Sequence, residues 1–324
     1  MICYLGLGGN LGAREKTLRL AIERIKKIRG VELLRVSSFY ETAAWGLTNQ
    51  PKFINAAVKI SATLEPTELL DELQRIELEL GRVRLEHWGA RTIDIDILFI
   101  EGLKINSPRL TVPHKFLYER DFALVPLREI SGLEFELHGD EVKKVAGSPR
   151  DFALKFVACV DKNFGIGFEN QLLFKIPADM KNFRALTLNN TVIYGRKTLA
   201  TFPEGKPLSS RRNIIFSRTL DKIENAEIVR DVENLWQILS AGEKNFVIGG
   251  GEIFSELLPY AAEIYLTVVD AEKPADSFFP KISGEFELIS TKNLGEGVEQ
   301  CNGNFVSQRY GHSVTYHFVS VVNI

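Results

Sequence analysis

The stretch Arg91-Thr92-Ile93-Asp94-Ile95-Asp96-Ile97 alternates isoleucine with polar residues along most of its length. A period of two is typical of a β-strand with one buried face, because successive side chains point to opposite sides of a sheet. We therefore expect the isoleucines to enter the core, and Asp94 and Asp96 to project together from the other face. Two adjacent carboxylates repel unless a cation or a proton lies between them.

Two interpretations of this pair remain open. One is the solvated outer face of an amphipathic strand, although aspartate is disfavoured in strands. The other is a magnesium site, since Mg²⁺ takes few protein carboxylates and completes its shell with phosphate oxygens and water. A basic residue alone is usually a surface charge, but several around a carboxylate pair favour a metal–polyphosphate site. The basic residues near the pair are Arg82, Arg84, Arg91, Arg109, His114 and Arg120.

The segments before this strand supply the rest of one fold unit. Short apolar runs predict strands, and apolar residues three or four positions apart predict helices. Strands are expected at residues 2–7, 31–40, 53–60 and 92–100, and helices at 18–28 and 66–80. The resulting order, strand–helix–strand–strand–helix–strand, matches the ferredoxin-like α+β motif.

A chain of 324 residues favours two domains. Composition changes over residues 137–150, where His, Gly, Ser and Pro collect, so we predict domains at 1–150 and 151–324. Residues 141–146 could add a short last helix to the first. The second half alternates strands and helices, which predicts an α/β domain with a mostly parallel sheet and helices on both faces. Its strands are expected at 155–160, 191–194, 213–217, 245–248 and 263–269, with late strands near Phe286 and at 315–319 closing the sheet antiparallel.

Composition restricts the partners. The formal charge of −2 gives no electrostatic reason to expect nucleic acid or a membrane surface. Apolar runs stay short of the roughly 20 residues that a membrane helix needs. Cys3, Cys159 and Cys301 are sparse and far apart, which indicates a reducing compartment. We expect a soluble cytoplasmic protein that acts on small molecules, with homo-oligomerisation left open.

A second candidate site begins at Pro177-Ala178-Asp179, which is typical of a helix start. Asp179 and Phe183 are four residues apart and share a helix face. A carboxylate beside an apolar wall should have a raised pKa, and it can hydrogen-bond the edge of a planar ring such as a pterin. The alternative is a carboxylate placed at a helix N-terminus only by the helix dipole.

Glycine turns follow two of the expected strands in the same half. Gly249-Gly250-Gly251 and Gly195-Arg196-Lys197-Thr198 each lead from a strand into a helix, where phosphate is attracted. The strand at 213–217 ends in Ser217-Arg218. Arg196, Lys197 and Arg218 therefore indicate a dinucleotide with an extra phosphate, NADP rather than NAD, unless they are only surface charges.

Six ordered segments of the first half resemble 6-hydroxymethyl-7,8-dihydropterin pyrophosphokinase (HPPK). They are Gly8-Gly9-Asn10-Leu11-Gly12 and residues 38–42, 50–56, 81–84, 88–96 and 110–114. The resemblance implies transfer of a diphosphoryl group from ATP to the hydroxymethyl group of the pterin, with release of AMP.

The resemblance also implies roles for single residues. Asp94 and Asp96 would hold two Mg²⁺ that bridge the triphosphate, and Arg82, Arg91 and Arg120 would contact phosphates during transfer. The implied nucleotide contacts are Gln74, Glu77, Arg84, Trp88, Arg109, Thr111, His114 and Arg120. The implied pterin contacts are Phe53 and Phe122 on its two faces, with Asn55 at its polar edge and Thr42.

Residues 155–320 resemble dihydrofolate reductase (DHFR). The matches include Val157-Ala158, Gly165-Ile166-Gly167, residues 176–179, 195–198, 211–213 and 248–251, Leu266-Thr267 and Asp276. The resemblance implies that Asp179 binds the pterin ring and promotes protonation at its N5, while NADPH gives a hydride to C6. It also implies that Thr267 bridges to Asp179, Phe183 packs on the substrate and Arg211 takes its glutamate carboxylate.

The cofactor set implied by the same resemblance is Ala158, Ile166, Gly195, Arg196, Lys197, Thr198, Ser217, Arg218, Gly249, Gly250 and Gly251. Leu173-Phe174 stands where this family usually has Pro-Trp, and a phenyl ring lacks the N–H donor of indole. The sequence therefore predicts a bifunctional folate-biosynthesis enzyme that uses Mg²⁺, ATP and NADPH on pterin and folate substrates. Two alternatives for the second half are a deaminoreductase-type reductase and a catalytically silent pterin- or NADP-binding module.

Overall fold

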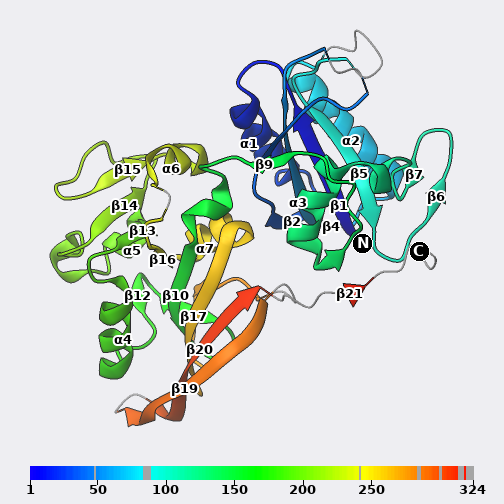
Figure 1. Ribbon diagram of the computed structural model, residues 1–324. Coiled ribbons are helices and arrows are strands. Elements are labelled where there is room, and N and C mark those ends of the chain that lie inside the picture. The colour runs from blue at the N-terminus through cyan, green and yellow to red at the C-terminus, as the bar shows by residue number, and fades with distance from the viewer. Residues whose placement is uncertain are drawn as a thin grey trace. The chain divides into compact units, whose positions relative to one another are not determined.

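The computed structural model describes residues 1–46, 49–82, 89–240, 242–282, 286–298, 301–312 and 317–318. The chain divides into two compact units, residues 1–149 with the described residues 317–318, and Arg150–Ser313 (Figure 1).

The first unit is built on an antiparallel sheet with the order β5-β1-β4-β3-β9, and β2 also pairs with β4. Its strands are β1 (Ile2–Gly9), β2 (Val31–Val36), β3 (Tyr40–Thr42), β4 (Phe53–Ala62), β5 (Asp94–Ile100) and β9 (Val142–Lys144). Its helices are α1 (Arg14–Ile25), α2 (Pro66–Glu79) and α3 (Asp121–Ser131). The strand and helix order that the sequence predicts for a ferredoxin-like unit is present.

Smaller elements complete this unit. β6 (Ile105–Asn106) pairs with β7 (Thr111–Val112), and β8 (Leu133–Glu134) pairs with β21 (His317–Phe318). A 3-10 turn at Leu117–Glu119 leads into α3. The core beneath α3 joins Leu124, Leu127 and Ile130 of the helix to Tyr4 and Leu98 of the sheet.

Two predictions for the first unit are wrong in detail. Residues 31–40 form two strands rather than one, because Ser38 hydrogen-bonds Glu129 through both its backbone N–H and its hydroxyl. Residues 142–144 form β9 rather than part of a helix. Pairing with β3 satisfies backbone groups at that edge of the sheet, which outweighs any local helical preference.

The second unit contains a large sheet with the order β15-β14-β13-β16-β10-β17-β20-β19. The first six strands in this order are parallel, as expected, and the last two are antiparallel. They are β10 (Leu154–Val160), β13 (Thr191–Gly195), β14 (Arg212–Phe216), β15 (Glu227–Val229), β16 (Asn245–Gly249), β17 (Ala261–Val269), β19 (Phe286–Val298) and β20 (Cys301–His312).

Short helices and a small sheet surround these strands (Figure 1). The helices are α4 (Pro177–Thr187), α5 (Arg196–Leu199), α6 (Val232–Ile238) and α7 (Gly251–Leu257), with 3-10 turns at Pro149–Phe152, Pro203–Gly205 and Leu258–Tyr260. The small sheet joins β11 (Gly165–Phe168), β12 (Gln171–Leu172) and β18 (Ser277–Phe278).

The antiparallel edge corrects one prediction. The strand that pairs with β17 is β20, at residues 301–312. Of the strand expected at 315–319, only residues 317–318 are among the described residues, and they pair with β8. The turn from β19 into β20 is rich in Gly and Asn, residues that are depleted in strands. The strand pattern is therefore obscured there, and the later apolar run resembles a strand more closely.

Candidate functional site

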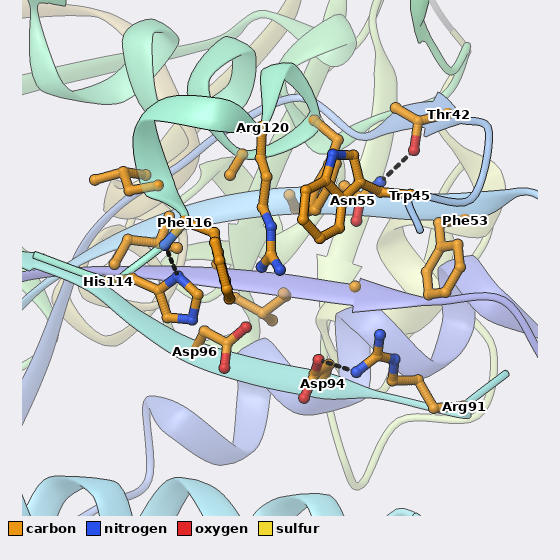
Figure 2. A pocket seen from close by; sticks show the side chains of 18 of the residues that line it. Thr42, Trp45, Phe53, Asn55, Arg91, Asp94, Asp96, His114, Phe116 and Arg120 are labelled. Atoms are coloured by element: carbon orange, nitrogen blue, oxygen red, sulfur yellow. Dashed lines mark hydrogen bonds and ion pairs between the residues drawn. The ribbon is translucent and has the colours of Figure 1, made fainter. Parts of the chain in front are cut away.

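A cavity of about 570 Å³ lies in the first unit, between the sheet and the segments around residues 42–45 and 114–123 (Figure 2). Residues from β1, β4 and β5 form its floor. Ten of the predicted site residues line it, and they are Thr42, Phe53, Asn55, Arg82, Arg91, Asp94, Asp96, His114, Arg120 and Phe122.

The aspartate pair occupies the face of β5 that was predicted. Ile95 and Ile97 are buried in the core, whereas Asp94 and Asp96 line the cavity. Each oxygen of Asp94 is held by an arginine: Nη1 of Arg82 lies 2.6 Å from Oδ1, and Nη1 of Arg91 lies 2.6 Å from Oδ2. The charge of Asp94 is therefore balanced by two arginines of the chain itself.

Asp96 lacks that compensation. Burial, followed by the nearby charges of Asp94 and Glu77, raises the pKa of Asp96 to about 7. A carboxylate held this close to its protonation point would be stabilised as an anion by a cation in the cavity. Among the described residues, no group of three or more His, Cys, Asp or Glu side chains is arranged to hold a metal. A cation at the aspartate pair would therefore need oxygens from a substrate and from water.

Glu77 lies behind the site instead of lining the cavity. Its side chain is 3% exposed. It accepts a hydrogen bond of 2.6 Å from the backbone N–H of Ile95, and it pairs with Arg82. Glu77 thus braces one catalytic arginine candidate and the strand that carries both aspartates.

Aromatic rings form the opposite wall of the cavity. The guanidinium of Arg120 lies 4.3 Å from the centre of the Trp45 ring and 4.8 Å from that of Phe116 (Figure 2). It also lies 5.6 Å from the centre of the Phe122 ring. Its Nε atom is buried without a hydrogen-bond partner. Sequence reasoning missed Trp45 and Phe116. The signal that could have found them was their closeness in sequence to Thr42 and His114, but only the fold brings the two rings together.

A polar edge lies next to these rings. Asn55 donates a hydrogen bond of 2.8 Å from Nδ2 to Oγ1 of Thr42 (Figure 2). The guanidinium of Arg91 lies 5.6 Å from the centre of the Phe53 ring. A candidate phosphate contact therefore lies next to a candidate pterin contact. The cavity therefore combines flat apolar faces, amide and hydroxyl groups, carboxylates and cations within one space.

Four predicted nucleotide contacts do not line this cavity. Glu77 is buried behind it, and Gln74 lies with it on α2. Arg109 is exposed and pairs with Asp71, and Thr111 is exposed on β7. Arg84 and Trp88 lie outside the described residues.

In the second unit, Asp179 lies in the first turn of α4, which begins at Pro177 as predicted. Burial raises the pKa of Asp179 above its ordinary value, and a hydrogen bond with the side chain of Thr267 offsets part of that effect. Thr267 is buried on β17. The carboxyl group thus keeps its proton to a higher pH than an exposed aspartate.

Phe183 lies one turn after Asp179 on α4, and Arg211 lies beside its ring. The guanidinium of Arg211 is 5.9 Å from the centre of the Phe183 ring, and its Nε donates a hydrogen bond of 2.9 Å to Oγ1 of Thr187 on α4. Burial and the charge of Arg184 lower the pKa of Arg211. An anion is the natural partner for such a pair of cations.

The two glycine turns meet at the carboxyl ends of β13 and β16. These strands are parallel and adjacent, so Tyr194 is opposite Gly249. A Cβ added at Gly249 would lie 3.4 Å from Oγ1 of Thr198, and its φ of +125° belongs to the region that glycine favours. Ser217 and the exposed Arg218 follow the neighbouring strand β14, whose Phe216 pairs with Gly195. Arg196 is exposed, and Lys197 pairs with Glu252.

Ala158 and Ile166, the other predicted cofactor contacts, are half-buried on β10 and β11. Leu173 and Phe174 are buried in one apolar cluster with Ile176 and Val269. The ammonium of Lys273 lies 4.7 Å from the centre of the Phe174 ring and donates to the carbonyl of Leu173. The departure at these two positions is therefore accommodated by packing and by a cation on the ring.

Comparison with known proteins gives matches to both halves. A family model described as 7,8-dihydro-6-hydroxymethylpterin-pyrophosphokinase (HPPK) matches residues 4–132, and one described as dihydrofolate reductase matches residues 153–309. Within the described residues, no helix is long and apolar enough to cross a membrane.

Curated relatives are similar to part of the chain. The 2-amino-4-hydroxy-6-hydroxymethyldihydropteridine pyrophosphokinase of Haemophilus influenzae is 45% identical over 128 residues, which are 40% of this chain and 80% of that protein. The Bacillus subtilis enzyme of the same name is 46% identical over 129 residues, which are 40% of this chain and 77% of that protein. The Bifunctional protein FolKE of Lactococcus lactis subsp. lactis is 39% identical over 143 residues, which are 44% of this chain and 41% of that protein.

Proposed function

The chain belongs to the HPPK family through residues 4–132 and carries a dihydrofolate reductase domain at residues 153–309, and from this premise we propose how its residues carry out the two reactions. Joined in one chain, the domains make a bifunctional enzyme of folate metabolism. HPPK enzymes use ATP, and dihydrofolate reductases use NADPH. The assignments of single residues that follow, and the use of Mg²⁺, are our proposals.

In the first unit, Asp94 and Asp96 would hold Mg²⁺ with phosphate oxygens of ATP. The donor set fits this ion, because two carboxylates share one face of β5 and Asp96 has no arginine paired with it in the described structure. When bound, the metal neutralises charge on the phosphates and aligns them with the attacking hydroxyl group.

The other cavity residues bind and orient the substrates. Arg82 and Arg91 form ion pairs with Asp94, and we assign both guanidinium groups to phosphate oxygens of ATP. Asn55 and Thr42 present amide and hydroxyl groups to the polar edge of the pterin. Phe53 and Phe122 supply flat apolar faces for its ring.

Two further cavity residues complete the site. Arg120 lies among aromatic rings without a paired carboxylate in the described structure, so it is available to the transferred group. Burial and the neighbouring Arg120 lower the pKa of His114, which keeps its ring neutral at pH 7. We assign both to the nucleotide, together with the predicted contacts Gln74, Arg84, Trp88, Arg109 and Thr111, and we assign Glu77, which is buried behind β5, to the support of Arg82.

In the second unit, Asp179 would hydrogen-bond the pterin ring of dihydrofolate and promote protonation at N5. Its raised pKa and its bond to Thr267 support this role. Phe183 would pack against the ring, and Arg211 would bind the glutamate carboxylate of the substrate. NADPH supplies the hydride that C6 receives.

The cofactor would lie along the carboxyl ends of β10, β13, β14 and β16. The glycines of both turns leave room for backbone approach, and the exposed guanidinium groups of Arg196 and Arg218 flank adjacent strand ends. Asp179 one turn before Phe183, with Arg211 beside that ring, supports a folate substrate over the deaminoreductase alternative. The hydrogen bond between Asp179 and Thr267, together with both glycine turns, supports a catalytic domain over a silent binding module.

We also propose that residues 1–150 and 151–324 are independent domains and that the enzyme acts in the cytoplasm. Cys3 is a buried thiol that forms no disulfide, which is usual for a reducing compartment.

One observation carries the proposal most strongly: the carboxylate pair, the guanidinium groups and the flat aromatic wall line the same cavity. The test is AMP formation from ATP with 6-hydroxymethyl-7,8-dihydropterin, and NADPH oxidation with dihydrofolate, by the same preparation. Turnover in both assays supports the proposal. Failure of either assay with correctly folded protein removes the corresponding half.

A further inference from the structure

Asn10 is a buried side chain at the end of β1 to which neither reaction assigns a role. It is 3% exposed. Its Oδ1 accepts a hydrogen bond of 2.8 Å from the backbone N–H of Arg91, and its own backbone N–H donates one of 2.9 Å to the carbonyl of Arg91. One residue therefore satisfies both backbone groups of Arg91.

The amide nitrogen of Asn10 extends the contact to another segment. Nδ2 donates to Oε1 of Gln50 at 3.1 Å and to the carbonyl of Pro51 at 3.0 Å. Gln50 and Pro51 precede β4, whose first residue is Phe53. Asn10 thus joins the residues that lead into β4 to those that lead into β5.

The glycine before Asn10 makes this arrangement possible. A Cβ at Gly9 would lie 2.3 Å from the carbonyl oxygen of Thr92, closer than non-bonded atoms can approach. The end of β1 can therefore lie against residues 91–92 only if this position has no side chain. Gly9 therefore lets the two segments approach each other closely, and Asn10 supplies the hydrogen bonds between them.

The hydrogen bonds of Asn10 fix the backbone of Arg91, whose side chain the proposed reaction needs in a defined place. The Nη1 atom of Arg91 lies 2.6 Å from Oδ2 of Asp94, and the guanidinium lies 5.6 Å from the centre of the Phe53 ring. Asn10 binds the backbone of Arg91 and the carbonyl of Pro51, which lies two residues before Phe53. The side chains of Arg91 and Phe53 therefore enter the cavity from segments that Asn10 holds. A shift of one ångström in such a residue can reduce a rate by about 10²-fold.

We propose that Asn10 is a positioning residue for diphosphoryl transfer. Its hydrogen bonds keep the guanidinium of Arg91 beside Asp94 and beside the ring of Phe53. The proposal rests on the pyrophosphokinase function proposed above. It concerns the hydrogen bonds of the Asn10 side chain, so variants that differ only in those bonds can test it.

The experiment compares Asn10→Leu, Asn10→Asp and Ser37→Ala in the full chain. Leucine has a shape close to that of asparagine but makes none of the three side-chain bonds. Aspartate keeps an acceptor for the Arg91 N–H and loses the donor to Gln50 and Pro51. Ser37→Ala is the matched control, because Ser37 is buried in the same unit and its hydroxyl accepts from the N–H of Ala57, away from the cavity.

The measurements are hydrogen exchange at the Arg91 amide by NMR, and kcat and KM for AMP formation, with NADPH oxidation as the internal reference. For Asn10→Leu we expect exchange at Arg91 to rise about tenfold and kcat to fall about 10²-fold, while the reductase rate stays unchanged. For Asn10→Asp we expect near-normal exchange at Arg91 and a smaller loss of kcat.

The proposal is overturned if Asn10→Leu lowers kcat no more than Ser37→Ala does. It is also overturned if Asn10→Leu leaves Arg91 exchange unchanged. If wild-type protein formed no AMP, the proposed function would fail, whereas the exchange measurement would still report whether Asn10 holds Arg91. Should Asn10→Leu fold poorly, Asn10→Asp decides, because loss of Arg91 protection in that variant contradicts the assigned acceptor.

Discussion

The guanidinium of Arg91 lies 2.6 Å from Oδ2 of Asp94. This ion pair holds a candidate phosphate-binding cation and a candidate metal ligand in place, each through the other. The same guanidinium lies 5.6 Å from the centre of the Phe53 ring, so the residue proposed to bind phosphate also contacts the residue proposed to bind the pterin.

The first prediction concerns the aspartate pair. Asp94→Ala or Asp96→Ala removes a ligand for Mg²⁺, and metal ions supply several kcal/mol of transition-state stabilisation. AMP formation should fall by about two orders of magnitude or more, since about 1.4 kcal/mol corresponds to a tenfold change in rate. Steady-state AMP release is the measurement, with NADPH oxidation by the same protein as the control. Near-normal AMP formation by the double variant would contradict the metal assignment.

The second prediction concerns Asp179→Asn. A positioned acid contributes about 10²- to 10⁴-fold, so hydride transfer should slow by a comparable factor at neutral pH. Binding of NADPH should be nearly unchanged, because Asp179 is assigned to the substrate. Single-turnover absorbance and cofactor titration separate the two effects. An unchanged single-turnover rate would mean that the proton is delivered from elsewhere.

The pH dependence of the reductase follows from the same residue. Burial raises the pKa of Asp179, so its protonated form persists above the usual range for aspartate and is lost as pH rises through the shifted value. The single-turnover rate should therefore decline with rising pH in the wild type. An asparagine side chain does not titrate, so Asp179→Asn should lack this step. The same decline in both proteins would assign it to another group.

Part of the fold and of the candidate site can be predicted from local sequence patterns. The alternation around Ile95 is sufficient to predict a strand and the shared face of Asp94 and Asp96, because both follow from the period of two. Pro177 likewise marks the start of α4. Such features depend on neighbours in the sequence, so local patterns contain them.

Other features depend on contacts between distant segments. Trp45 follows β3 and Arg120 precedes α3, so the two side chains meet only after β3 has joined the sheet and α3 has packed against it, and no local pattern reports that contact. Glu77 fits the position of a nucleotide contact, yet it is buried behind β5 and bonded to the N–H of Ile95. The edge strand β9 forms because β3 offers a partner, which local preference does not encode.

The third prediction concerns cofactor choice. Arg196 and Arg218 are exposed beside adjacent strand ends, and hydrogen bonds to charged groups contribute about 1.5–3 kcal/mol. The double variant Arg196→Gln/Arg218→Gln should raise KM for NADPH far more than for NADH. Lys206→Gln is the matched control, since this exposed cation pairs with Glu204. Equal changes for the two cofactors would exclude a 2′-phosphate site at these residues.

The fourth prediction concerns the stability of the first unit. Asp121 is 1% exposed and accepts hydrogen bonds from the backbone N–H groups of His138, Gly139 and Asp140. Burial raises the pKa of Asp121, but these bonds outweigh it and the net pKa is lowered. Its stabilisation is therefore present above the unfolded-state pKa and is lost as pH falls through the folded-state pKa.

Asp121→Asn should accordingly lower the free energy of unfolding by about 1–3 kcal/mol at neutral pH. The difference from the wild type should shrink in acid, where the wild-type carboxyl group is itself protonated. Urea denaturation at several pH values measures this, with Asp140→Asn as the exposed control. A difference that grows in acid would have the wrong sign for a lowered pKa.

The central claim is that one chain performs two chemically separate reactions at two sites. The most direct measurement follows AMP formation and NADPH oxidation in parallel for the wild type, Asp94→Ala/Asp96→Ala and Asp179→Asn. The account predicts that the wild type does both, that the first variant loses only AMP formation, and that the second loses most of its reductase rate alone. Absence of either activity in the folded wild type, or loss of both activities in either variant, would contradict it.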